Sequence, residues 1–230
     1  MPLTKISINN FRCFEGLEIS LSPGVNFFYG ANGSGKTSIL EAAFIFSSGK
    51  SFKSSNLTSL IKHNCNNFLL KAYDGKRGYV AEIEKNKNKS ISVLLNNNKI
   101  VTSKLIKEFP CTPIHNNTFS FADASPDFRR KLLDRSIFIA EEEFSRTWFS
   151  YYKALKQRNH MLKNNRISDI YAWNNKLSQD GEMLSKLRNN FFDKTLQEFK
   201  ILLKRLEPNN IFDFFESISI NFSQGWSAEN

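Results

Sequence analysis

Apolar side chains recur at nearly every second position in residues 3–8 and again in residues 17–21. A period of two places the apolar side chains on one face of a strand, so we predict two strands joined by a tight loop within residues 9–16. A turn is expected at residues 22–24, which read Ser-Pro-Gly. The short apolar and aromatic run of residues 25–29 is expected to form a third, buried strand.

Three further stretches have strand-like patterns, at residues 68–72, 79–83 and 91–95. The polar, glycine- and asparagine-containing residues 74–78 and 96–99 separate them and are typical of turns. The pattern therefore predicts an antiparallel β-subdomain. Its lysines Lys85, Lys87 and Lys89 suit either contact with a DNA backbone or a solvated hairpin.

Helical patterns follow other parts of the chain. Residues 38–46 contain helix formers, and Gly49 is the expected stop. Ser125 and Pro126 suit an N-cap and a first helical position. Aromatic and leucine residues then recur at helical spacing up to Pro208, which predicts two long antiparallel helices, and alternation at residues 218–222 predicts a return to sheet.

Composition limits the class of protein. The chain has 230 residues, of which 40% are hydrophobic, so a globular protein with a packed core is expected. Its net charge of +10 favours an anionic partner, with nucleic acid first, although an AT-rich genome would also enrich lysine. Three widely spaced cysteines and the lack of a long apolar run predict a cytoplasmic protein with no membrane segment.

Residues 30–37 read Gly-Ala-Asn-Gly-Ser-Gly-Lys-Thr and fit the pattern G-x-x-x-x-G-K-[ST] of a phosphate-binding loop. Its glycines let successive N–H groups surround phosphate oxygens, and the lysine adds a positive charge. The Thr37 hydroxyl would bind Mg²⁺. A plain turn would not need the lysine and threonine at this spacing. The candidate nucleotide-binding residues are Gly30, Ala31, Asn32, Gly33, Ser34, Gly35, Lys36, Thr37 and Ser38.

Arg12 lies in the first predicted connection, where it is either a nucleotide contact or a solvated loop arginine. Together with residues 6–11 and the phosphate-binding loop, it resembles the N-terminal lobe of the RecF/SMC/Rad50 group of ABC-type ATPases. Within that group, the chain most resembles the RecF family. Residues 51–54, 125–134 and 152–159 match further motifs of this family, and the resemblance extends from Leu3 to about Trp226.

The resemblance implies an α/β fold: a P-loop NTPase of the ABC-type ATPase head, with an antiparallel β-subdomain and an inserted helical arm. It divides the chain into an N-terminal ATPase lobe (residues 1–124), a helical arm (residues 125–208) and the start of a return to sheet (residues 209–230). Residues 112–117 depart from the family pattern, which weakens any assignment of a nucleotide-sensing role there.

The resemblance also implies a function. It implies an ATP- and Mg-dependent DNA-binding protein of recombinational repair, replication restart and the SOS response, with weak DNA-dependent ATPase activity. The implied partners are double-stranded DNA, single-strand/double-strand junctions, RecO, RecR and a second copy in an ATP-dependent homodimer that helps to load RecA. The candidate DNA contacts are Arg129, Arg130, Lys153, Lys156 and Arg158, for which a solvated helix face is the alternative.

Hydrolysis would also require an acidic residue after an apolar strand, a carboxylate that orients water, and a signature loop from a second protomer. Asp134 lies within a predicted helix, the strand before Asp213 is too short, and residues 223–225 lack the glycine-rich context of a signature loop. The chain is therefore expected to be truncated before the Walker B strand and not to hydrolyse ATP alone. The alternatives are another SMC/Rad50-like chromosome-maintenance ATPase, a small-molecule P-loop kinase, and a catalytically silent binding fragment.

Overall fold

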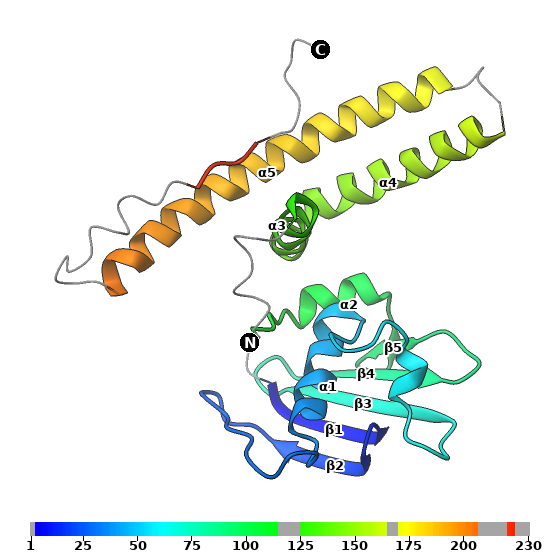
Figure 1. Ribbon diagram of the computed structural model, residues 1–230, viewed down its shortest axis with the longest axis vertical. Coiled ribbons are helices and arrows are strands. Elements are labelled where there is room, and N and C mark those ends of the chain that lie inside the picture. Colours follow the sequence, from blue (N-terminus) through cyan, green and yellow to red (C-terminus); the bar gives the residue numbers. More distant parts are fainter. Residues whose placement is uncertain (1–2, 115–124, 165–169, 207–219, 224–230) are drawn as a thin grey trace. The chain divides into compact units, whose positions relative to one another are not determined.

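The computed structural model describes residues 3–114, 125–164, 170–206 and 220–223 (Figure 1). The chain divides into two compact units, Met1–Phe119 and Ser120–Asn230. Among the described residues, the first contains a β-sheet with two α-helices and a short 3₁₀ helix, and the second contains three α-helices. Across the described ranges, no helix combines the length and the apolar character that crossing a membrane would require.

The first unit is built on one six-stranded antiparallel sheet with the order β2-β1-β3-β4-β5-β6. Its strands are β1 (Leu3–Phe11), β2 (Phe14–Ser20), β3 (Asn67–Asp74), β4 (Tyr79–Asn86), β5 (Ser92–Leu95) and β6 (Asn98–Lys99). The register pairs Ile8 with Leu70 and Leu70 with Ile83, so the buried residues of neighbouring strands share one face. Side-chain alternation is the physical cause, because a period of two directs every second residue to the same side.

Two helices cover this apolar face of the sheet: α1 (Lys36–Ser48) and α2 (Thr102–Glu108) (Figure 1). From α1, Ala42, Ile45 and Phe46 are fully buried in the core, and Leu105 joins them from α2. The predicted stop is confirmed, because Gly49 caps α1 with a left-handed backbone (φ 63°). A short 3₁₀ helix, η1 (Leu57–Leu60), adds the buried Leu60.

One detail of the sequence prediction is wrong. Residues 25–29 do not form a buried strand, because no described strand pairs with them and the side chains of Val25, Phe27 and Tyr29 are 75%, 84% and 93% exposed. A strand needs a hydrogen-bonding neighbour, which local apolar character does not supply. The predicted tight loop within residues 9–16 is confirmed, since Phe11 pairs with Phe14 across Arg12 and Cys13.

The antiparallel strands predicted in residues 68–95 are confirmed as β3, β4 and β5. β3 pairs with β1 along most of its length, so all six strands form one sheet. This single sheet depends on pairing between residues 60 or more positions apart, which a local sequence pattern does not reveal.

The second unit consists of α3 (Pro126–Ala140), α4 (Glu142–Lys163) and α5 (Ile170–Leu206). The Ser125 hydroxyl accepts a hydrogen bond from the Phe128 N–H, which confirms the predicted N-cap. The helix predicted after it is interrupted at Glu141, whose extended backbone separates α3 from α4. Figure 1 shows α4 and α5 as long antiparallel neighbours.

Ile137, Phe144 and Leu184 form the buried centre of this unit, one from each helix. Beside it, Arg188 of α5 forms two hydrogen bonds with Asp134 of α3, of 2.7 and 2.8 Å. The guanidinium also lies 6.0 Å from the centre of the Phe144 ring. This pair stabilises the packing of α3 on α5. The predicted position of Asp134 inside a helix is confirmed.

Replacing Asp134 with alanine is expected to destabilise the helical unit by about 2 kcal/mol, because Arg188 loses two charge-assisted hydrogen bonds in a largely buried setting. Urea unfolding followed by tryptophan fluorescence measures this, since Trp148 lies in the packed core of this unit. Arg146→Ala is the control: its ion pair with Glu142 is exposed and should contribute less than about 0.5 kcal/mol. Equal losses in both variants would contradict the prediction.

Several expectations fall partly or wholly outside the described residues. These are the helix end at Pro208, the segment before Asp213, Ile218 of the expected final strand, Gln224 and Gly225, and His115 to Asn117 of the divergent segment. Residues 220–223 are described and have no regular secondary structure.

Candidate functional site: a cationic phosphate cavity

The loop of residues 30–37 adopts a conformation that only glycine takes readily at three positions. Gly30, Gly33 and Gly35 have φ angles of 147°, 84° and 94°. A Cβ atom added at Gly35 would lie 2.3 Å from the Phe14 ring and 3.0 Å from the sulfur of Cys13, so the loop closely approaches the β1–β2 hairpin. The glycine pattern therefore has a steric cause in this chain.

The loop leads directly into α1, whose N-cap is Gly35. No side chain caps this helix end, which leaves the first-turn N–H groups of Lys36, Thr37 and Ser38 facing the loop. Unpaired N–H groups and the positive end of the helix dipole together favour an anion at this position. Thr37 is exposed, so its hydroxyl is accessible.

Lys36 is folded back onto its own loop. Its Nζ atom donates hydrogen bonds of 2.8 Å to the carbonyl oxygens of Gly30 and Ala31. Because an ammonium group has three donors, one remains for a ligand oxygen without breaking either bond. The lysine thus both supports the loop and places a positive charge inside it.

Arg12 is neither a solvated loop residue nor a free cation. Its Nε and Nη2 atoms donate hydrogen bonds of 2.9 and 2.8 Å to the two carboxylate oxygens of Glu41, which is fully buried on α1. The Ser51 hydroxyl donates a third hydrogen bond to the same carboxylate. The network joins the β1–β2 hairpin, α1 and the segment after α1.

Burial by itself raises the pKa of Glu41, because it disfavours the charged form. The hydrogen bonds from Arg12 and Ser51, with the charges of Arg12 and Lys53, outweigh burial and hold the pKa of the Glu41 carboxyl below its usual value. The same pairing raises the pKa of Arg12. The carboxylate is therefore ionised at neutral pH and neutralises part of the charge on Arg12.

A cavity of about 590 Å³ brings these groups together. Of the predicted residues, Asn32, Gly33, Gly35, Lys36, Thr37, Ser38 and Arg12 line it, whereas Gly30, Ala31 and Ser34 belong to the loop behind it. Lys53 also lines the cavity and was not identified from the sequence. Glu41 was missed as well, although a lone charge within the apolar run of residues 39–46 was a usable signal for a buried ion pair.

The residues present fit a nucleotide's phosphates. Three cationic side chains, Arg12, Lys36 and Lys53, line the cavity, and no acidic side chain of the described residues joins them there. The glycine cradle would be filled by an added Cβ at Gly35, and the first-turn N–H groups lack a side-chain cap. Lys36 and the N–H groups would hold phosphate, and the Thr37 hydroxyl would bind Mg²⁺. A bound nucleoside triphosphate would supply a transferable phosphoryl group.

The predicted DNA contacts lie in the helical unit. Arg129 and Arg130 are exposed in the first turns of α3, and Lys153 and Lys156 are exposed on α4. Arg158 differs from them, because it is half-buried and donates a 2.7 Å hydrogen bond from Nε to Asn174 of α5. Arg158 therefore contributes to helix packing.

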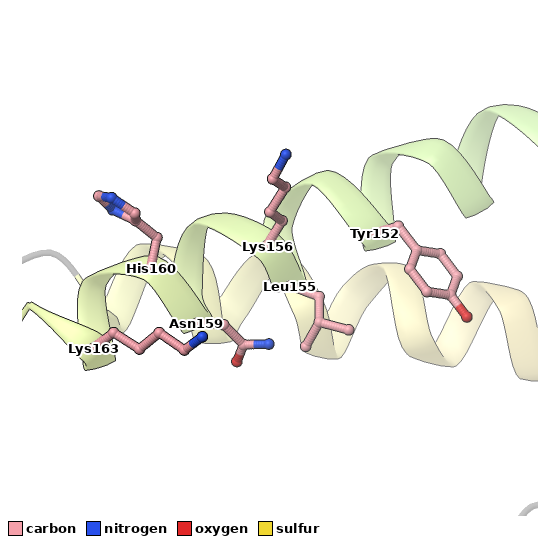
Figure 2. A pocket seen from close by; sticks show the side chains of 6 residues that line it. All are labelled: Tyr152, Leu155, Lys156, Asn159, His160 and Lys163. Atoms are coloured by element: carbon pink, nitrogen blue, oxygen red, sulfur yellow. The ribbon is translucent and has the colours of Figure 1, made fainter.

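Figure 2 shows a second cavity, of about 390 Å³, on α4. Lys156, His160 and Lys163 line it together with Tyr152, Leu155 and Asn159. No acidic residue follows Glu143 in α4, whereas lysine or arginine occupies positions 146, 153, 156, 158 and 163. The surface of α4 that carries Lys153, Lys156, His160 and Lys163 is therefore strongly basic.

Comparisons with known proteins agree with this geometry. A family model described as an AAA domain matches residues 5–225. The DNA replication and repair protein RecF of Actinobacillus pleuropneumoniae serotype 5b (strain L20) is 34% identical over 232 residues, which cover 98% of this chain and 62% of the relative. RecF of Shewanella denitrificans is 30% identical over 233 residues, covering 100% of this chain and 63% of the relative. The chain thus spans somewhat less than two thirds of these relatives' length.

Solved structures show the same fold. A structure of the recombination mediator protein RecF-ATPrS in the RecFOR pathway superposes with a TM-score of 0.74 at 27% identity, covering 84% of this chain and 54% of that one. A RecF-ATP structure superposes with a TM-score of 0.73 at 26% identity, with the same coverage. The predicted fold class, a P-loop ATPase head lobe with mixed α/β structure, is confirmed.

Proposed function

This chain belongs to the AAA domain family and is a homologue of the RecF proteins, and from this premise we propose that it is part of an ATP-dependent DNA replication and repair protein. The observation that carries the proposal is the cationic cavity at the start of α1, lined by Lys36, Thr37 and Arg12. The similar proteins of known structure include RecF-ATP, which supports ATP as the ligand.

In this proposal the loop of residues 30–38 binds the phosphates of ATP, and Thr37 binds Mg²⁺ through its hydroxyl. Residues 1–124 act as the ATPase lobe and residues 125–208 as a helical arm. ATP binding drives homodimerisation on gapped or junction DNA in the cytoplasm, with RecO and RecR as partners, and the complex helps to load RecA during the SOS response. Hydrolysis requires further groups in addition to the phosphate-binding loop.

The experiment is a titration of the full-length protein with ATP and Mg²⁺ by calorimetry, followed by DNA binding to a gapped duplex with and without ATP. Saturable ATP binding and tighter DNA binding in its presence are expected. A protein that binds no ATP, or whose DNA affinity is the same with and without ATP, contradicts the proposal. A small-molecule kinase would bind ATP but would not respond to the gapped duplex.

The DNA contacts form a separate part of the proposal. The basic face of α4 (Lys153, Lys156 and Lys163, with His160 between the last two) is proposed to contact DNA phosphates together with Arg129 and Arg130 of α3. All three lysines are exposed, and no ion pair to a described residue neutralises them. Positive charges without acidic neighbours bind a phosphate backbone by releasing its counterions.

Replacing Lys153, Lys156 and Lys163 together with alanine is expected to weaken DNA binding and to reduce the slope of log affinity against log salt by about 2 to 3. Fluorescence anisotropy of a labelled gapped duplex at several salt concentrations measures the slope. The matched control changes Lys186, Lys200 and Lys204, which are exposed on α5, in the same way. Equal changes of slope in both triple variants would show that the α4 face has no particular role.

A further inference from the structure

Glu41 occupies a position that links two sides of the phosphate cavity. It is fully buried on α1, five residues after Lys36, and its carboxylate binds both Arg12 and Ser51. An isolated buried carboxylate is strongly unfavourable, so its partners must be held close to it. Glu41 therefore determines where these two partners lie.

The position of Arg12 is restricted on its backbone as well as on its side chain. Its φ angle is 53°, which a non-glycine residue seldom adopts, and its N–H donates a 2.7 Å hydrogen bond to the carbonyl of Leu60. Glu41 engages only Nε and Nη2 of the guanidinium. The Nη1 donors have no partner among the described residues, and Arg12 lines the cavity. They are available to an anion there.

Ser51 organises the other side. Its hydroxyl donates to Glu41 and also accepts hydrogen bonds from the N–H groups of Lys53 and Ser54, of 2.8 and 2.9 Å. These bonds form the tight turn that carries Lys53. The Lys53 side chain is exposed, lines the same cavity and has no ion pair with a described residue. Two cations, Arg12 and Lys53, are thus placed through one carboxylate.

We propose that Glu41 is a positioning residue, which through Arg12 and Ser51 places Arg12 and Lys53 as a second pair of phosphate-binding cations in addition to Lys36. This inference rests on the proposed ATP binding and extends it: the phosphates are held by the loop and by residues that α1 itself anchors. Glu41 touches neither nucleotide nor metal, because it is buried beneath the cavity lining.

The first test measures the affinity of the full-length protein for ATP and Mg²⁺. Arg12→Lys removes the bidentate pairing and should weaken binding about tenfold, and Lys53→Met should weaken it about fivefold. Lys53→Met should also lower the dependence of affinity on salt. The control is Lys50→Met, an exposed lysine that does not line the cavity, which should leave affinity unchanged.

The second test separates positioning from folding with double-mutant cycles. Glu41→Gln should weaken ATP binding alone but add nothing in the background that carries both Arg12→Lys and Lys53→Met, and Ser51→Ala should add nothing in the Lys53→Met background. Thermal unfolding of every variant without nucleotide reports stability independently. Fully additive losses would mean that Glu41 and Ser51 act independently of Arg12 and Lys53, which overturns the inference.

Wild-type binding of ATP combined with equal affinities for Arg12→Lys, Lys53→Met and Lys50→Met would overturn the inference and leave the proposed function intact. A wild-type protein that does not bind ATP would overturn both. The two failures are therefore distinguishable in one set of titrations.

Discussion

Replacing Lys36 with alanine is expected to weaken ATP binding by about 100-fold, which corresponds to the loss of about 3 kcal/mol from charge-assisted hydrogen bonds. The structure gives two reasons. The ammonium group holds the carbonyl oxygens of Gly30 and Ala31 together, and it is the cation closest in sequence to the uncapped start of α1. Alanine removes both the loop support and the charge.

Calorimetric titration with ATP and Mg²⁺ measures this change, and the ATP-induced rise in unfolding temperature provides a second readout. Lys50→Ala is the matched control, because Lys50 is exposed and lies outside the cavity. The stability without nucleotide should be similar in both variants, since the Lys36 ammonium group donates its hydrogen bonds to its own loop. An affinity of Lys36→Ala within threefold of the wild type would rule out this role.

Replacing Arg12 with alanine is expected to destabilise the sheet-containing unit by about 3 kcal/mol, because it leaves the buried Glu41 carboxylate with only the Ser51 hydroxyl. Few single substitutions of a partly exposed residue have so large an effect. Arg12→Leu combined with Glu41→Leu should recover most of the loss, since no unpaired charge then remains. Lys5→Ala is the control, because its ion pair with Glu18 is exposed and should contribute less than about 0.5 kcal/mol.

The stability measurement for Arg12→Ala must follow the unfolding of the sheet-containing unit. Trp148, Trp173 and Trp226 all lie outside Met1–Phe119, so tryptophan fluorescence does not follow the unfolding of the sheet. Hydrogen exchange of the backbone amides of α1 and β1 does, because it reports local and global opening at each site. Unchanged protection of these amides in Arg12→Ala would contradict the expected loss.

The pH dependence of the free energy of unfolding tests the role of the Arg12–Glu41 pair independently, because the direction of the change is fixed by the shift in the Glu41 pKa. The pKa of Glu41 is lowered in the folded protein, so its contribution is present above the unfolded pKa of about 4.3 and is lost as pH falls through the folded pKa. In Arg12→Ala the main opposing influence is removed and burial raises the pKa instead. Acidification below neutral pH should then relieve, and not increase, the destabilisation caused by Glu41.

Local signals predicted much of this fold. The period-two alternation located β1 to β5 within a few residues, because the pleat requires it wherever one face is buried. Gly49 and Ser125 marked a helix end and a helix start correctly, because capping depends on the backbone and side chain of single residues. The glycines and Lys36-Thr37 identified the phosphate-binding loop for the same reason: its chemistry lies within eight consecutive residues.

Contacts between distant segments were not predictable in this way. Residues 25–29 have the composition of a strand, but a strand exists only where a neighbour pairs with it. Arg158 looked like a surface cation, whereas the packing of α4 on α5 brings it to Asn174. Asp134 and Arg188 are 54 positions apart, so only the crossing of α3 and α5 makes them a pair.

Local sequence patterns were sufficient to identify a phosphate-binding loop at the start of a helix, strands with one apolar face, and a basic helical region. How the cavity is built depends on the tertiary structure. It pairs Glu41 with Arg12, which lies 29 positions earlier in the sequence, and brings Lys53 to the cavity that Lys36 lines. The physical reason is that a motif specifies its own backbone, whereas the side chains that complete a site meet only after sheet and helix have packed.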